Sequence, residues 1–148
     1  MLSLTFKHRV VWILRLSTSV IFLLLGSVKI AVLFKFGLEP YREIVFVAGL
    51  PGIVKYYGLV AALVELYLAV GLWRSRHYFT AIILALIMTA AGSIISIALL
   101  VFKINSECGC GLLGDSEGWL LLQKGLILVG LIFLYKNKMI LFDANAQT

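Results

Sequence analysis

Apolar residues follow one another along this chain in four long runs, and the polar residues gather in the short stretches between them. The runs cover about 10–34, 56–73, 78–102 and 119–135. A helix that spans a bilayer needs roughly 20 mostly apolar residues, whereas a membrane β-barrel needs an alternation that these uniform runs lack. The pattern therefore predicts an all-α integral membrane protein, a four-transmembrane-helix bundle that forms a single membrane domain over 1–148.

The polar stretches at the start of the chain and after the first run predict two further features. Lys7-His8-Arg9 resembles the start of a signal peptide, but the apolar part that follows is too long and lacks a small-residue cleavage site, which predicts a retained helix. Between the first two runs, Pro40 favours a first helical turn and Pro51-Gly52 breaks the far end. We expect a short interfacial helix there, lying at the membrane surface.

Composition and charge exclude several classes of protein. Apolar residues make up 62% of the 148 residues and charged residues 14%, which leaves too little polar surface for a soluble globule. Four spans also leave no room for a second domain. The net charge of +6 reflects basic flanks on the cytoplasmic side, and we expect no nucleic-acid partner.

The distribution of Lys and Arg in the connections predicts the orientation in the membrane. With four spans, three basic connections share one side, which the rule makes cytoplasmic. The outer loop 103–118 instead holds one Lys103 against three acidic residues. We therefore expect a multi-pass protein of the bacterial inner membrane with both termini in the cytoplasm and this loop in the periplasm. The basic residues are Lys7, Arg9, Arg74, Arg76, Lys136 and Lys138, and the acidic ones are Glu107, Asp115 and Glu117.

The outer loop contains the only two cysteines of the chain, Cys108 and Cys110, with Gly109 between them. Disulfides form and persist outside the cytoplasm, and glycine relaxes the backbone restriction on so small a ring. A strained, exposed disulfide exchanges readily, and closing so short a loop stabilises a fold little. The pair therefore favours redox exchange, with two inert thiols as the alternative.

A metal site in the outer loop would need more ligands than one chain brings there. His8 and His77 fall on the cytoplasmic side, so a single chain cannot assemble a Cys/His zinc site, and we expect no metal. A zinc ion shared by the cysteine pairs of a dimer is a minor alternative. The sequence leaves the oligomeric state open.

Ionisable residues inside the apolar runs are candidates for function, because a charge in the bilayer is costly. Counting about 1.5 Å per residue places Lys29 and Lys124 at a similar depth, beneath the cysteine loop. The same count places Glu65 closer to the cytoplasmic face, with Arg15 as its expected partner. We expect Glu65 to be paired or protonated inside the bundle.

Two roles are open for the lysines. They could form a positive vestibule that favours the thiolate of Cys108 or Cys110 or holds an anionic or quinone-like ligand. They could equally extend their ammonium groups into the lipid headgroups. Small residues, Gly58 with Ala62 and Gly92-Ser93 with Ser96, are expected to form close-packing faces between helices.

Short motifs in three regions together resemble the MauE branch of the DoxX-like membrane proteins. They are Gly26-Ser27-Val28-Lys29 followed by Phe34 or Phe36, Leu63-Val64-Glu65-Leu66 followed by Gly71, and Cys108-Gly109-Cys110-Gly111. That family typically has an aromatic residue and a glycine directly after Cys-Gly-Cys and an Arg-Asn pair in the last helix. Here those positions read Gly111-Leu112-Leu113-Gly114 and Gln123-Lys124, where Lys124 could keep the positive charge.

The resemblance implies a four-helix protein of the bacterial cytoplasmic membrane that supports the maturation of a periplasmic, disulfide-rich protein. It also implies a thioredoxin-like or cysteine-rich periplasmic partner. Four helices with outer cysteines are similar in architecture to DsbB and the vitamin K epoxide reductases, which makes a quinone a possible cofactor.

The leading hypothesis is a membrane thiol–disulfide component, an oxidoreductase-like protein in which Cys108 and Cys110 carry the exchange in either order. The first alternative is a non-catalytic subunit that anchors or assembles a partner. The second is a bundle that binds or transports a small ligand around Glu65 and Lys29.

Overall fold

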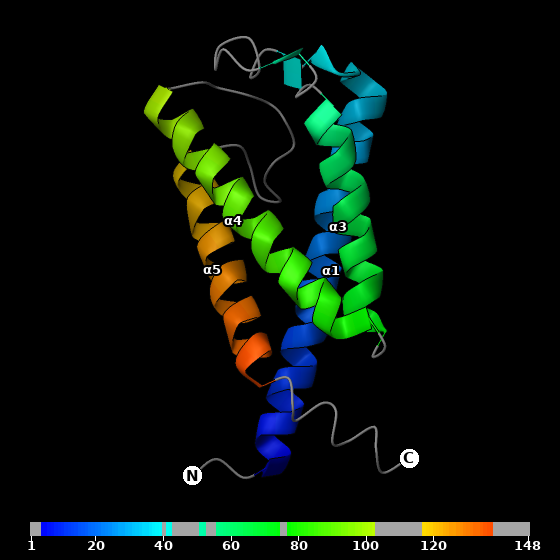
Figure 1. Ribbon diagram of the computed structural model, residues 1–148, viewed down its shortest axis with the longest axis vertical. Coiled ribbons are helices and arrows are strands. Elements are labelled where there is room, and N and C mark those ends of the chain that lie inside the picture. Colours follow the sequence, from blue (N-terminus) through cyan, green and yellow to red (C-terminus); the bar gives the residue numbers. More distant parts are fainter. Residues whose placement is uncertain are drawn as a thin grey trace.

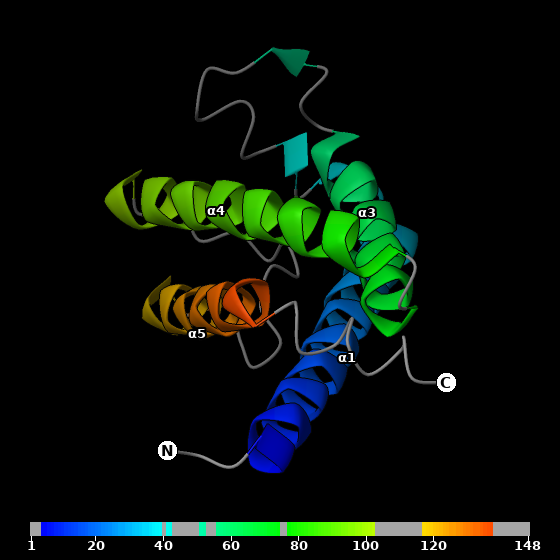
Figure 2. The same cartoon turned by 60° about the horizontal axis from the view of Figure 1, so that its bottom comes forward.

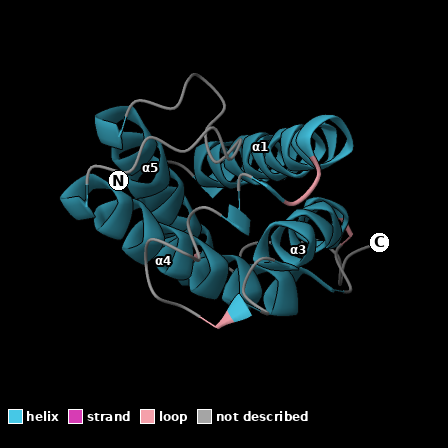
Figure 3. Ribbon diagram, turned by 90° about the horizontal axis from the view of Figure 1, so that it is seen from above, coloured by secondary structure: helices cyan, strands magenta, loops and turns pink. Residues whose placement is uncertain are grey.

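The computed structural model describes residues 4–39, 41–42, 51–52, 56–74, 77–102 and 117–137 of the chain. Within these ranges every regular element is helical (Figure 3), which confirms the all-α class. Each helix covers one of the apolar runs. The helices are α1 (Leu4–Phe36), α3 (Tyr57–Trp73), α4 (Tyr78–Phe102) and α5 (Glu117–Lys136).

The helices form two antiparallel pairs. Helix α1 packs most extensively on α3 and α4 on α5, and the pairs meet mainly through α3 and α4 (Figures 1 and 2). Successive helices run in opposite directions, so each end of the bundle collects four helix ends. The basal end, at the bottom of Figure 1, has Leu4, Trp73, Tyr78 and Lys136. The distal end has Phe36, Tyr57, Phe102 and Glu117.

Apolar side chains fill the bundle and also cover its outside. Residues such as Leu68, Ile82 and Leu131 are fully buried between the helices. Large apolar residues such as Ile94 and Val129 remain about two-thirds exposed on the outer faces, at 68% and 67%. A surface so rich in exposed apolar side chains suits lipid better than water.

Two helices are long and apolar enough to cross a membrane, judged by length and composition: α1 over Phe6–Phe36 and α5 over Gly118–Lys136. With the apolar outer faces, these helices indicate a membrane protein.

Helix α1 and α3 approach each other closely where both carry small residues. A Cβ added at Gly26 would lie 3.0 Å from Cγ of Leu66 and 3.1 Å from the carbonyl oxygen of Ala62, tighter than ordinary contact. Nearer the basal end, Ser19 donates a hydrogen bond of 2.7 Å to the carbonyl of Ala69. Small side chains thus let the two backbones pack closely, as in other membrane helix pairs.

The stretch between α1 and α3 is described only in part. Glu39, Tyr41 and Arg42 are helical, and the rest of the expected interfacial helix lies outside the described residues. The ring of Tyr41 lies directly over Gly58, where any Cβ would overlap it. Burial of this ring, together with the negative charge of Glu65, raises the pKa of Tyr41 to about 12, so its phenol stays neutral.

Candidate functional site

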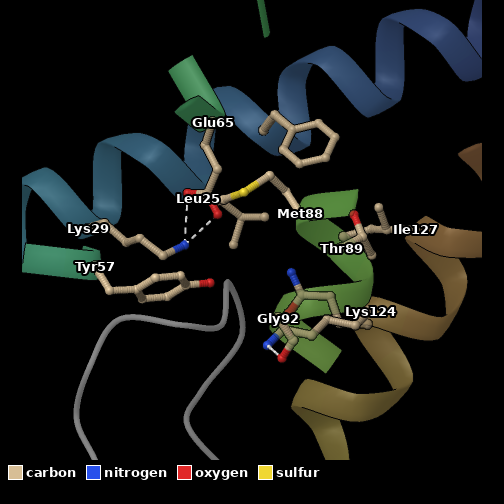
Figure 4. A pocket seen from close by; sticks show the side chains of 11 residues that line it. Leu25, Lys29, Tyr57, Glu65, Met88, Thr89, Gly92, Lys124 and Ile127 are labelled. Atoms are coloured by element: carbon tan, nitrogen blue, oxygen red, sulfur yellow. Dashed lines mark hydrogen bonds and ion pairs between the residues drawn. The ribbon is translucent and has the colours of Figure 1, made fainter. Parts of the chain in front are cut away.

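A cavity lies between the two helix pairs, in the distal half of the bundle (Figure 4). The cavity has a volume of about 60 Å³ and an open mouth. Helices α1 and α3 line one side, and α4 and α5 line the other. The apolar wall consists of Phe22, Leu25, Met88 and Ile127, and the polar lining of Lys29, Tyr57, Glu65, Thr89, Gly92, Gln123 and Lys124.

A buried ion pair joins α1 to α3 at this cavity. Nζ of Lys29 donates to both carboxylate oxygens of Glu65, at 2.6 and 2.8 Å (Figure 4). The two residues are only 6% and 9% exposed. The expectation that Glu65 is paired inside the bundle is therefore confirmed, and Lys29 does not extend to the lipid headgroups.

The expectation that Arg15 is the partner of Glu65 is wrong, because counting residues along the helix axes ignored the direction of the side chains. Helical side chains tilt towards the N-terminus of their own helix. Lys29 on α1 therefore reaches towards the basal end, and Glu65 on the antiparallel α3 reaches towards the distal end, so the two side chains close the axial gap. The side chain of Arg15, on the same helix as Lys29, also tilts towards the basal end and therefore points away from Glu65.

Arg15 instead binds the basal end of α3. Its Nε donates to the carbonyl of Leu72 and its Nη2 to the carbonyl of Trp73, the latter at 2.6 Å. The guanidinium also lies 4.7 Å from the centre of the Tyr78 ring. The last carbonyls of a helix lack intrahelical partners, so a cation placed there stabilises the helix terminus.

Lys124 crosses from α5 to α4. Its Nζ donates to the carbonyl of Gly92, at 2.6 Å, and to Oγ of Ser96. The Ser96 hydroxyl in turn donates to the same Gly92 carbonyl, at 3.0 Å. Lys124 thus binds inside the bundle, and among the described residues its partners are neutral groups.

The charges in the described lining of the cavity consequently do not cancel. Its described lining contains two ammonium groups and one carboxylate, and that carboxylate already binds Lys29 through both oxygens. The expected vestibule of two lysines becomes one neutral ion pair and one cation. Lys124 is the cation without a carboxylate partner in the described part of the chain.

The structure brings together Lys29, Glu65 and Lys124, three of the five site residues expected from the sequence. The other two, Cys108 and Cys110, lie outside the described residues. Two further polar residues of the cavity escaped the sequence analysis, Tyr57 and Thr89, whereas Gln123 was noted there beside Lys124. Gly92 and Ser96 were expected to serve helix packing, whereas they also bind Lys124, a role that small residues do not signal on their own.

No group of three or more metal-binding side chains comes together within the described ranges. The cavity offers hydrogen-bond donors and an apolar wall. It is therefore suited to an organic ligand.

No curated protein and no solved structure matches the chain. A family model does match, that of the methylamine utilisation protein MauE, over residues 7–136. These residues include all four described helices except the first turn of α1. The chain therefore belongs to the MauE family of membrane proteins.

Proposed function

We propose that this protein is a membrane thiol–disulfide component whose cysteines, Cys108 and Cys110, exchange disulfides with a periplasmic partner. In this proposal α1, α3, α4 and α5 all span the inner membrane. A short interfacial helix precedes α3, and both termini are cytoplasmic. The partner is a thioredoxin-like or cysteine-rich protein whose maturation depends on the exchange.

The charges at the two ends of the bundle support this orientation. Lys7, Arg9, Arg74 and Lys136 all belong to the basal end, which the positive-inside rule assigns to the cytoplasm. Helix α4 has 25 residues and no charged side chain, enough to cross the bilayer. The distal end then faces the periplasm, and the cysteines belong to the segment that joins the distal ends of α4 and α5.

The proposed reaction is an exchange that needs no further reactant. A thiolate of the partner attacks one sulfur of the Cys108–Cys110 disulfide, and a mixed disulfide forms while the other cysteine leaves as a thiolate. The second thiol of the partner then displaces the bound cysteine. Two electrons and two protons pass from the partner to this protein, and a second exchange, with the disulfide of another oxidised protein, passes them on and restores the Cys108–Cys110 disulfide.

The charge of Lys124, which no carboxylate in the described part of the chain pairs with, is the observation that carries the proposal. Lys124 lies seven residues into α5, about 10 Å from the distal end at 1.5 Å per residue. A cation near a cysteine favours the reactive thiolate. Because Glu65 neutralises Lys29, we assign this electrostatic role to Lys124 and a structural role to the Lys29–Glu65 pair.

Trapping of the mixed disulfide tests the exchange. Cys108→Ser and Cys110→Ser are each expressed in cells that contain the periplasmic proteome, and adducts are separated without reductant. We expect at least one variant to accumulate an adduct that a reductant releases, and we expect the double variant to lose maturation of the partner.

The proposal is wrong if neither single variant forms an adduct and the double variant supports normal maturation. The redox state of the pair in cells separates exchange from a docking role. A pair that exchanges occurs in both forms and follows the level of its partner, whereas a structural disulfide in an assembly subunit stays oxidised.

A further inference from the structure

The cavity between the helix pairs combines an apolar wall with one excess positive charge among the described residues of its lining. The wall is formed by four apolar side chains from α1, α4 and α5, namely Phe22, Leu25, Met88 and Ile127. Lys124 is fixed in position by the Gly92 carbonyl and the Ser96 hydroxyl. A buried cation without a counter-ion is costly, and an anion that enters the cavity would recover part of that cost.

We infer that this cavity is a binding site for one organic monoanion, a carboxylate carried on an apolar body. The carboxylate accepts hydrogen bonds from Lys124, and the apolar body lies against the wall. The inference concerns a ligand and needs neither cysteine, although it shares Lys124 with the thiol–disulfide exchange proposed above.

The lining of the cavity fits such a ligand. Small-molecule sites have mostly apolar walls and a few polar groups that fix the orientation, and this cavity has both. The hydroxyl of Tyr57 points into it opposite Lys124 (Figure 4), where it can donate a further hydrogen bond. Lys124 has three N–H donors and uses two of them on Gly92 and Ser96, which leaves one for a ligand.

The net charge of the described lining predicts that substitutions of neighbouring residues change the affinity for an anion in opposite directions. Lys124→Gln lowers the net charge of the described lining from +1 to zero and should weaken anion binding. Lys29→Gln should do the same, because it frees Glu65 to neutralise Lys124. Glu65→Gln raises the net charge to +2 and should strengthen anion binding. If the cavity selected its ligand by shape alone, these substitutions would not change the affinity for an anion in opposite directions.

The test uses the full chain in nanodiscs of zwitterionic lipid and measures binding by equilibrium dialysis, with empty nanodiscs as the blank for partition into lipid. The probe is 2-naphthoate, and 2-naphthamide is its neutral counterpart of the same shape. The control variant is Lys136→Gln, which removes one positive charge from the exposed basal end of the same helix.

We expect the unaltered protein to bind 2-naphthoate about tenfold or more tighter than 2-naphthamide, the size of one charge-assisted hydrogen bond. Lys124→Gln should abolish this preference and Lys136→Gln should keep it. The inference is overturned if the protein binds both probes equally, or if Lys136→Gln lowers the preference as much as Lys124→Gln does.

A double variant covers the case in which Glu65→Gln or Lys29→Gln does not fold. Lys29→Met with Glu65→Leu replaces the ion pair by apolar side chains and leaves Lys124 as the cation of the cavity. We expect this variant to keep the preference for 2-naphthoate within about threefold of the unaltered protein, since the net charge is unchanged. Loss of the preference in a folded double variant overturns the inference.

The source of the anion follows from one further comparison. Dodecanoate, dissolved in the nanodisc lipid, represents an anion that arrives from the bilayer, and 2-naphthoate represents one that arrives from water. Competition between them at a site that depends on Lys124 supports the inference, and the tighter ligand identifies the source. Binding of dodecanoate that does not change in Lys124→Gln contradicts it.

Discussion

The two helix pairs of this bundle differ in how completely their polar groups satisfy one another. In the α1–α3 pair, Lys29 binds both carboxylate oxygens of Glu65, and Arg15 binds the last carbonyls of α3. The backbones approach closely at Gly26. In the α4–α5 pair, Lys124 binds only neutral groups among the described residues.

This difference separates structure from function within the cavity. In the α1–α3 pair the buried charges are neutralised and the small residues are in close contact. The α4–α5 pair keeps one charge that the described part of the bundle does not neutralise. Such a charge is available to a thiolate or to a ligand, which is why both proposals depend on Lys124 and not on Lys29.

The largest effect is expected from breaking the ion pair. Glu65→Leu leaves the ammonium group of Lys29 buried without a counter-ion, and removing one partner of a buried pair typically costs about 3–5 kcal/mol. We expect a loss of this size in the free energy of unfolding, measured by reversible unfolding in mixed detergent micelles.

The double variant Lys29→Met, Glu65→Leu is the control, because it removes both charges together. It should recover most of the stability lost by the single variant, since paired charges replaced by apolar side chains cost little. A double variant as unstable as Glu65→Leu would mean that the shape of the side chains, and not the charge pairing, holds α1 to α3.

A smaller effect is expected from filling the contact at Gly26. Gly26→Ala forces α1 away from Leu66 and the carbonyl of Ala62, and such overpacking costs about 1–3 kcal/mol. Gly125→Ala, at an exposed position of α5, is the control and should be neutral or stabilising by up to about 1 kcal/mol, because alanine favours a helix. Equal costs at the two positions would contradict the close contact at Gly26.

Much of the fold could be predicted from the sequence, because membrane helices have a strong and simple signal. Long apolar runs without charge leave few alternatives to a helix, and α1, α3, α4 and α5 lie on the four expected runs. The close approach at Gly26 could not be found in this way. A glycine in an apolar run signals the possibility of contact, but the contacting residue on the other helix depends on the rotation of both helices.

The residues of the site could be recognised, but not their pairing. Lys29, Glu65 and Lys124 stand out because ionisable residues in apolar runs are rare. Their partners depend on which way long side chains extend along the helix axis, which a count of residues does not give. Neutral partners such as Ser96 have no signal at all, because serine in a membrane helix most often bonds to its own backbone.

Removing the charged side chain of Lys124 is expected to change the stability less than the substitutions at Glu65 and Gly26. In Lys124→Met, the hydroxyl of Ser96 keeps its hydrogen bond to the carbonyl of Gly92, so no described polar group loses its last partner. The free energy of unfolding should change by about 1 kcal/mol or less, in the same micelle assay. A loss of about 3 kcal/mol would make Lys124 a structural residue like Glu65.

The most direct test of the central claim is the rate at which a membrane-impermeant alkylating reagent labels the reduced cysteines of spheroplasts, measured from about pH 6 to about pH 9 to include the ordinary thiol pKa of about 8.5. We predict labelling without permeabilisation and a half-maximal rate below that pH. Lys124→Met should shift the half-maximal rate to higher pH, and the Lys29→Met, Glu65→Leu variant should not. Cysteines that are labelled only after permeabilisation, or a pH profile unchanged by Lys124→Met, would contradict the account.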